Sequence, residues 1–208
     1  MNCISYLDDL AREFCEIIAT QPNTSLVPTK DYGWENHRWS SPTFRLAHVE
    51  IFNQDRFMVI HCCVFPHVSD PSPIFGFDVI SGESKVTGLF MDLSPTVRQP
   101  EPFCDFPELA SRQRPEWGDI FSEHFLACRP TAEQLVRIGD RAKQLLTDYL
   151  PSLGQLRHVS EPIAAAQDHY CLQQRRNEHT RRALINLIGQ ELTDEFMTTV
   201  LFPTVSGT

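Results

Sequence analysis

The chain has 208 residues, of which 41% are hydrophobic and 22% charged, and this fits one globular domain over residues 1–208. Its net charge of −9 disfavours general nucleic-acid binding, which needs a basic surface. No stretch has the roughly 18 uncharged apolar residues of a membrane span, and the N-terminus "MNCISYLDDLAREF" lacks the pattern of a signal peptide. We therefore expect a cytoplasmic protein that does not enter membranes.

Seven cysteines are present, and two of them, Cys62 and Cys63, are adjacent. An odd count with an adjacent pair does not indicate a complete disulfide framework. No CxxC pair suggests a zinc knuckle. Most of these thiols are predicted to be small core residues.

The first predicted element is an amphipathic helix over residues 5–18. Ser5 and Asp8 are spaced as a capping box. Apolar residues recur at helical spacing at Leu7, Leu10, Phe14 and Ile18. The next segment, residues 21–39, is polar and contains proline and glycine, so it is expected to be mostly loop with one short strand.

Four short segments rich in β-branched and aromatic residues follow, and they predict an antiparallel meander. They are residues 44–52, 57–65, 74–80 and 86–93. The second segment, "FMVIHCCVF", is apolar on both of its faces. Both faces of the sheet should therefore be covered.

Helices are predicted for the C-terminal half, after a loop rich in proline and acidic residues at 99–116. The predicted helices are 131–149, closed by Pro151 and Gly154; 162–176; 180–188, closed by Gly189; and 192–201. The predicted fold class is thus α/β, a three-layer α/β/α sandwich with a central antiparallel sheet flanked by helices on both faces.

Ionisable residues stand inside the predicted strands, and the simplest hairpins bring them together. If residues 53–56 form the first loop, His48 lies opposite His61. If residues 66–73 form the next connection, His61 faces Asp78. Opposed residues of an antiparallel pair share a face, with β-carbons about 5 Å apart.

Two further residues complete the predicted arrangement. Glu50 follows His48 by two positions and so lies on the same face. With residues 81–85 as the next turn, Asp78 meets Gly88, which leaves room above the sheet. The sequence therefore predicts a row of four ionisable groups over the sheet.

Such a row is energetically unfavourable in a dry core. One unpaired buried polar group costs several kcal/mol, against a domain stability of about 5–15 kcal/mol. The four groups either satisfy one another or line a cavity that accepts water and ligand. Coupled histidines and carboxylates in a cleft exchange protons near neutral pH, as acid–base chemistry requires.

A metal site is an alternative interpretation of the same residues. His48, Glu50 and His61 match the two-histidine, one-carboxylate ligand set of non-haem iron oxygenases. The tight spacing weakens this interpretation, because histidines side by side across a hairpin need not converge on one ion.

At these residues the sequence resembles the ferredoxin-dependent bilin reductase family. The matching pieces occur in the family's order between about Phe44 and Pro203: "FRLAHVEI", "HCCVFP", "PIFGFDVISG", "MDLSPT", "WGDIFSEHFLACRP", "EPIAAAQDHYCLQQRRNEHTRRAL" and "TTVLFP". Together they are specific, although each piece alone is weak.

The resemblance implies an α/β/α sandwich that holds the open-chain tetrapyrrole biliverdin IXα between the sheet and the C-terminal helices. It implies a monomer with no bound metal and no flavin. Electrons arrive singly from reduced [2Fe-2S] ferredoxin, pass through bilin radicals, and are matched by protons from side chains.

The family's catalytic residues fall on the predicted row. By resemblance, Asp78 hydrogen-bonds the bilin and donates protons, and His61 relays a proton with it. Glu50, with His48 beside it, would protonate a vinyl group of one terminal ring. That glutamate favours the branch that makes phycocyanobilin, although related short members make phycoerythrobilin.

The resemblance also implies substrate-binding residues. Arg129 matches a position that pairs with a substrate propionate, as a bidentate guanidinium can, and Gln174 and Thr87 match lesser pocket positions. Glu178 and His179 depart from the family's aspartate and lysine, so reach and charge change there.

Basic residues of the helical half would, on this resemblance, include a dock for acidic ferredoxin. They are Arg137, Arg141, Lys143, Arg175, Arg176, Arg181 and Arg182. Solvated helix faces explain them equally well. A non-catalytic bilin-binding protein also remains open.

Overall fold

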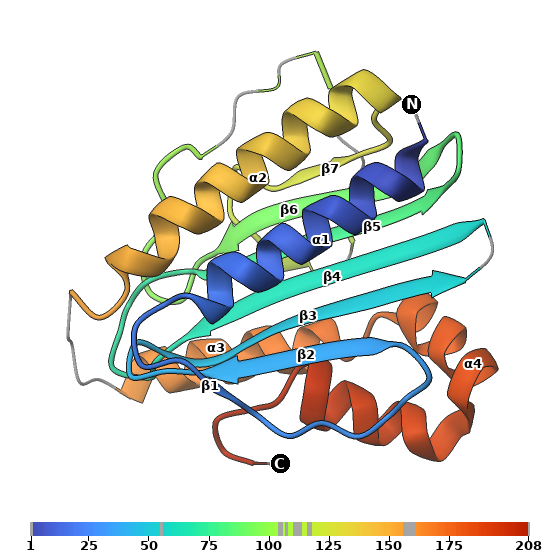
Figure 1. Ribbon diagram of the computed structural model, residues 1–208. Coiled ribbons are helices and arrows are strands. Elements are labelled where there is room, and N and C mark those ends of the chain that lie inside the picture. Colours follow the sequence, from blue (N-terminus) through green and yellow to red (C-terminus); the bar gives the residue numbers. More distant parts are fainter. Residues whose placement is uncertain are drawn as a thin grey trace.

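A seven-stranded antiparallel sheet, with its strands in the order β1 to β7, forms the middle layer of the molecule (Figure 1). The strands are β1 (Ser25–Leu26), β2 (Glu35–Ser40), β3 (Phe44–Gln54), β4 (Phe57–Pro66), β5 (Ile74–Gly82), β6 (Val86–Ser94) and β7 (Leu126–Cys128). This computed structural model describes residues 2–54, 56–103, 106, 108–109, 114–115, 118–155 and 161–207. The predicted loop at 99–116 lies partly outside these described residues.

Helices cover both faces of the sheet, which confirms the predicted α/β/α sandwich (Figure 1). The helices are α1 (Cys3–Ala19), α2 (Ala132–Ser152), α3 (Glu161–Gln174) and α4 (Glu178–Phe196), with the short turns η1 (Gly118–Ile120) and η2 (Met197–Leu201). One face lies under α1 and α2, and the other under α3, α4 and η2. None of the helices described is long and apolar enough to span a membrane.

The two faces hold separate hydrophobic cores. Alternate residues of the central strands, such as Phe77 and Val79, pack under α1 and α2. The other core contains Phe65 and Ile74 with side chains from α3 and η2. Cys62 belongs to the first core and its neighbour Cys63 to the second, and both are free thiols.

Helix α1 begins earlier than its predicted start. Asn2 is the N-cap, since its side chain accepts hydrogen bonds from the backbone N–H groups of Ile4 and Ser5. The predicted capping box at Ser5 is therefore wrong. Thr131 caps α2 with Gln134, as a reciprocal capping box.

The break predicted at Gly189 is present inside α4. This residue has φ 78° and ψ 168°, a region of backbone space that is essentially restricted to glycine. The helix therefore changes direction here before it continues to Phe196.

Two of the three predicted strand registers differ from the structure. Gln54 pairs with Phe57, so Glu50, and not His48, lies opposite His61. Asp78 lies opposite Phe90, and Gly88 lies opposite Ile80. Both differences are slips of two residues, which keep each side chain on its predicted face. The predicted pairing of His61 with Asp78 is confirmed.

Candidate active site

Four ionisable side chains lie on the sheet face that α3, α4 and η2 cover. Glu50, His61 and Asp78 are direct neighbours on β3, β4 and β5. His48 lies two positions from Glu50 on β3 and pairs with Cys63. The predicted row is therefore assembled, with Glu50 nearer its centre than expected.

Burial falls along the row from β3 to β5. The side chain of His48 is fully buried and that of Glu50 is 7% exposed. The side chain of His61 is 13% exposed and that of Asp78 is 39% exposed. One end of the row is therefore sheltered, and the Asp78 end is open to a ligand.

His61 and Asp78 form a hydrogen-bonded pair at the open end, between Nδ1 of the ring and Oδ1 of the carboxylate. Burial disfavours the charged ring, but the Asp78 carboxylate outweighs it and raises the pKa of His61 above its ordinary value. Glu50 adds to that increase. The pair can therefore hold and move a proton near neutral pH.

Glu50 is held by a residue that the sequence did not single out. The indole Nε1–H of Trp34 donates a hydrogen bond of 3.0 Å to Oε2 of Glu50. Burial raises the pKa of Glu50 to about 7, and the Trp34 hydrogen bond partly opposes this increase. The carboxyl group is thus suited to give up a proton at neutral pH.

His48 lies beside Glu50 at the sheltered end, with 3.6 Å between Nδ1 and Oε1. Its ring centroid is 5.0 Å from that of His61, and the ring stacks on Phe65. Burial lowers the pKa of His48 well below its ordinary value, and the charges of His61 and Arg38 act in the same direction. His48 is therefore neutral at pH 7.

Strand β2 adds two polar residues to the same face, because Asn36 pairs with Glu50 and Arg38 pairs with His48. Arg38 donates a hydrogen bond of 2.9 Å from Nη2 to the carbonyl of Thr199. These two residues were not predicted as site residues, because the polar stretch "ENHRWS" does not show the apolar alternation of a strand.

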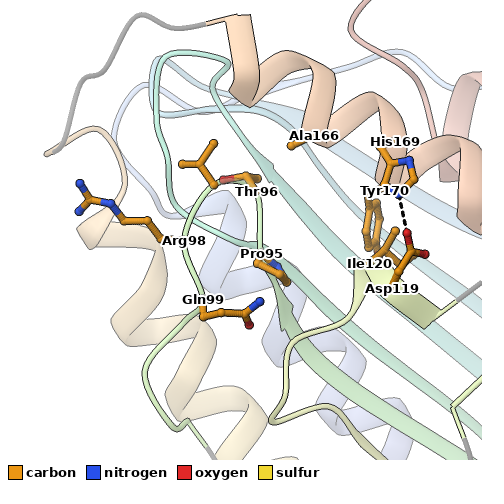
Figure 2. A pocket seen from close by; sticks show the side chains of 10 residues that line it. Pro95, Thr96, Arg98, Gln99, Asp119, Ile120, Ala166, His169 and Tyr170 are labelled. Atoms are coloured by element: carbon orange, nitrogen blue, oxygen red, sulfur yellow. Dashed lines mark hydrogen bonds and ion pairs between the residues drawn. The ribbon is translucent and has the colours of Figure 1, made fainter.

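The half of this face above β5 is only partly covered. Alternate residues of β5 on the site face, Gly76, Asp78 and Ile80, are half-buried, whereas Phe77 and Val79 on the other face are fully buried. A cavity of about 290 Å³ lies nearby, between residues 95–99, η1 and α3 (Figure 2). The carboxylate of Asp78 is therefore accessible from this side of the sheet.

Tyr170 connects this cavity to the site. Its side chain lines the cavity, and its hydroxyl group would lie 3.7 Å from a β-carbon at Gly76. Gln174 donates a hydrogen bond of 3.0 Å to that hydroxyl, which places this predicted pocket residue on the site face.

The other predicted binding residues lie at the edges of the site face. Nε of Arg129 donates a hydrogen bond of 2.9 Å to the carbonyl of Thr87, and both residues are exposed. Glu178 and His179 are exposed in the first turn of α4. The hydrogen bond to Thr87 uses Nε of Arg129, so among the described residues the terminal nitrogens of this side chain stay available to a carboxylate.

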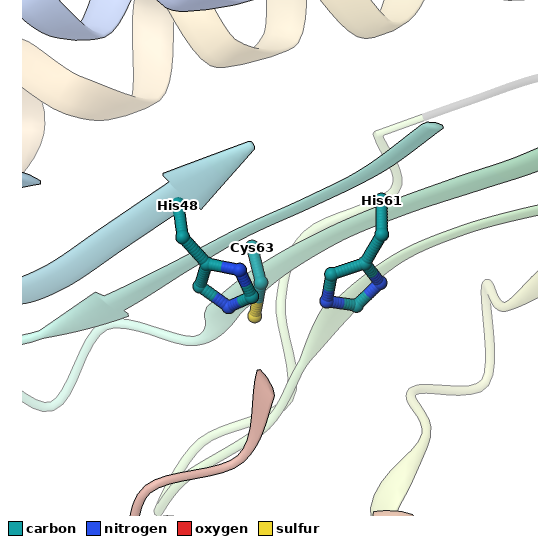
Figure 3. Close-up of side chains that lie close together, drawn as sticks. All are labelled: His48, His61 and Cys63. Carbon is teal, nitrogen blue, oxygen red and sulfur yellow. The ribbon is translucent and has the colours of Figure 1, made fainter. Parts of the chain in front are cut away.

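A possible metal-ligand group also lies in the row. Ligand atoms of His48, His61 and Cys63 are within 4.8 Å of one another (Figure 3). The predicted oxygenase set had Glu50 as its third ligand. The group whose ligand atoms lie together in the structure has Cys63 in that place.

Comparisons with known proteins identify the family. The family model of ferredoxin-dependent bilin reductases matches residues 14–203. The chain belongs to this family. It is an oxidoreductase, and the resemblance inferred from the sequence is confirmed.

Curated relatives of this bilin reductase include phycocyanobilin:ferredoxin oxidoreductases of cyanobacteria. The protein of Trichodesmium erythraeum is 33% identical, over 81% of this chain and 75% of its own length. Those of Synechococcus sp. and Synechococcus elongatus are each 34% identical, with the same coverage.

Solved structures show the same fold as this bilin reductase. PcyX matches with a TM-score of 0.70 and 24% identity, over 96% of this chain and 99% of its own. Tomato phytochromobilin synthase, solved with biliverdin, matches with a TM-score of 0.72 and 16% identity, over 95% of this chain and 82% of its own.

The basic residues of this bilin reductase do not form one patch. Arg137, Arg141 and Lys143 lie on α2, on the face away from the site, whereas the four arginines from 175 to 182 lie on the α3–α4 side (Figure 1). Several are paired: Arg137 with Glu108 at 2.6 Å, Lys143 with Glu13 at 2.9 Å, and Arg181 with Asp194.

Proposed function

We propose that this chain reduces biliverdin IXα to a phycobilin with electrons from reduced [2Fe-2S] ferredoxin. The tetrapyrrole lies on the partly covered sheet face above β5, beside Asp78. Electrons enter the bilin singly, so bilin radicals form between them, and each electron is matched by one proton from the protein.

One observation carries the proposal. A histidine–carboxylate pair, His61 with Asp78, stands at the open end of an otherwise buried row of titratable groups. A bilin radical anion needs a proton donor within hydrogen-bond distance as its charge develops. This pair provides such a proton donor next to the part of the site face that is incompletely covered, above β5.

Two proton donors serve two parts of the substrate in this mechanism. Asp78 hydrogen-bonds the lactam and pyrrole edge and gives a proton that His61 replaces. Glu50, whose pKa is about 7, gives a proton to the vinyl group of a terminal ring, and neutral His48 lies beside it. Reduction of each carbon–carbon double bond consumes two electrons and two protons.

The charged propionates of the substrate would be bound at the edges of the site. Arg129 offers its terminal nitrogens to one propionate, with Thr87 beside it. Gln174 contributes through its contact with Tyr170. Glu178 and His179 lie at the start of α4, where they would face the substrate edge if the helix closes over it.

The proposed product is phycocyanobilin, with phycoerythrobilin as the alternative. Glu50 supports the first, because it lies in the site with a pKa suited to vinyl protonation. The names of the cyanobacterial relatives support it as well.

Acidic ferredoxin would dock on the α3–α4 side, where Arg176 and Arg182 are exposed. This side is nearer the proposed bilin than the arginines of α2, which lie across the sheet. The protein would act as a cytoplasmic monomer.

The test is an anaerobic assay with purified protein. Biliverdin IXα should show a shifted and structured visible absorption band when the protein is added, and reduced ferredoxin should then change its colour. Chromatography identifies the product. No spectral response to biliverdin would refute the proposal, and complex formation without turnover would indicate a non-catalytic bilin-binding protein.

A further inference from the structure

The sheltered part of the row holds a group of side chains that bilin reduction does not need as a set. His61 and Cys63 are two residues apart on β4, and His48 of β3 pairs directly with Cys63. All three side chains point to the same side of the sheet (Figure 3). We propose that His48, His61 and Cys63 form a binding site for a zinc ion.

The buried nitrogens of this group are poorly satisfied by the described residues, although the backbone of Leu201 interacts weakly with the His48 ring. His48 and Cys63 are 0% exposed. Neither ring nitrogen of His48, nor Nε2 of His61, makes a hydrogen bond of normal geometry to any residue that the structure describes. Buried polar atoms are almost always satisfied, since leaving one unpaired costs about 1–3 kcal/mol. A metal ion would satisfy a nitrogen of each ring.

His61 is already oriented as a metal ligand. Asp78 accepts a hydrogen bond from Nδ1 of the ring, so the neutral ring carries its proton there and its lone pair is on Nε2. Metal-bound histidines in proteins are oriented by the same carboxylate contact. The negative charge of Asp78 also offsets part of the charge of a bound ion.

The ligand set favours zinc. Zn²⁺ binds histidine nitrogen and cysteine sulfur in tetrahedral sites, and with these three ligands a water molecule would complete the tetrahedron. Bonds of about 2.0–2.1 Å to nitrogen and 2.3 Å to sulfur place ligand atoms roughly 3.3–3.6 Å apart. The observed atoms lie within 4.8 Å of one another, so the side chains would have to move closer together when the ion binds.

Binding involves no redox change. The Cys63 thiol loses its proton to solvent, and its sulfur forms a bond to the ion. The thiolate is a soft ligand, so this site would bind the ion more tightly than exposed acidic residues of the surface, which would bind it weakly through oxygen.

The ion would inhibit bilin reduction. Zinc on Nε2 of His61 would occupy the nitrogen through which the ring takes up a new proton, so a proton passed from Nδ1 to Asp78 could not be replaced. This consequence rests on the proposed function, whereas the binding itself does not. The two parts can therefore fail separately.

Binding is tested with untagged, bilin-free, chelator-treated protein titrated with Co²⁺, which reports on zinc sites through its spectrum. We expect one Co²⁺ per chain, visible bands of a tetrahedral ion, and a thiolate-to-cobalt charge-transfer band that excess Zn²⁺ removes. Cys63→Ala should lose the charge-transfer band and bind Zn²⁺ at least tenfold more weakly. Cys62→Ala is the matched control, because this equally buried neighbour faces the opposite core, and it should keep the band.

Two results would overturn the zinc site: no charge-transfer band in the wild type, or an unchanged band in Cys63→Ala. For inhibition, zinc-loaded protein is freed of unbound ion before biliverdin and reduced ferredoxin are added. The zinc-loaded protein should be at least fivefold less active than the unloaded protein for the wild type and for Cys62→Ala, but not for Cys63→Ala. Equal ratios in all three proteins would exclude inhibition through this site.

Discussion

The protonation state of His61 depends on one neighbouring carboxylate. Burial lowers the pKa of His61 and Asp78 raises it, and the net result is an increase. In Asp78→Asn, burial would be opposed only by the weaker effect of Glu50. We expect the pKa of His61 to fall, as measured by NMR titration of its ring protons.

A matched control for this substitution is Asp119→Asn. Asp119 forms an ion pair of 2.9 Å with His169 at the surface, so its loss should leave His61 unchanged. With biliverdin and reduced ferredoxin, Asp78→Asn should stop at a radical or partly reduced bilin. Full turnover by this variant, or an unshifted His61, would contradict the role given to Asp78.

Trp34 is a positioning residue for Glu50. Its indole N–H stabilises the carboxylate form of Glu50 and so lowers a pKa that burial has raised. Trp34→Phe keeps an aromatic ring among Tyr32, Phe52 and Phe196 but removes the donor. We expect the pKa of Glu50 to rise by roughly 0.5–1 unit, as measured from the infrared carbonyl band that Glu50→Gln removes.

Trp39→Phe is the control for this change, because Trp39 is a buried tryptophan of β2 in the opposite core. It should leave the infrared titration of Glu50 unchanged. A Trp34→Phe protein with the wild-type titration would show that the hydrogen bond has no influence on Glu50.

At the scale of elements, the central strands and the helices could be predicted from hydrophobic pattern, since β-branched and aromatic runs at 44–52 and 57–65 exclude most alternatives. The short strands β1 and β7 and the polar strand β2 could not, because pairing with neighbours, not their own composition, makes them strands. One short strand was expected within residues 21–39, but its position was not assigned, so Asn36 and Arg38 of β2 were not included in the predicted site.

The four residues of the row were predictable although their register was not. The predicted turn at 53–56 included Asn53 and Gln54, which belong to β3. The predicted register of β3 against β4 was therefore shifted by two positions. Side chains alternate between faces with a period of two, so an even slip changes neighbours but not faces. Trp34 escaped prediction because it precedes β2 in a loop, where nothing in the sequence fixes its direction.

Gly189 divides α4 into two helical segments, and the backbone there requires glycine. A β-carbon at this position would meet no atom within 4 Å, so Gly189→Ala tests backbone strain alone. We expect it to lower the free energy of unfolding by about 1–3 kcal/mol, as measured in urea.

Gly76→Ala is the control for this change. The nearest atom to its added methyl group would be 3.7 Å away, so its loss of stability should be below about 0.5 kcal/mol. Equal losses would contradict the strain.

At the scale of the whole molecule, the two sides of the sheet have different tasks. The α1–α2 side is a continuous apolar core that includes the strand residues Val49, Ile60 and Phe77. The other side also has an apolar core, but it contains the buried His48 and Glu50 and the partly buried His61. The ionisable groups that reduce stability therefore lie on the side proposed to bind substrate.

This division predicts how stability depends on pH. The pKa of Glu50 is raised from 4.5 to about 7 by burial, so the folded chain holds a proton that the unfolded chain has already lost. The stability associated with this group is complete below about pH 4.5 and is lost as pH rises through about 7. The full loss is roughly 3 kcal/mol as an upper bound, from 1.36 kcal/mol per pKa unit.

Glu50→Gln keeps a neutral side chain at every pH and should escape this loss. The quantity of interest is the free energy of unfolding of Glu50→Gln minus that of the wild type, both measured in urea. This difference should be about 2–3 kcal/mol larger at pH 8 than at pH 4.5. His48 and His61 titrate in both proteins, so the difference at each pH isolates the carboxyl group to first order. Exposed Glu123→Gln removes the same charge without a buried group and should follow the wild type. If the advantage of Glu50→Gln were constant with pH, Glu50 would already be ionised in the folded chain at pH 4.5, and it could not be the acid that protonates a vinyl group.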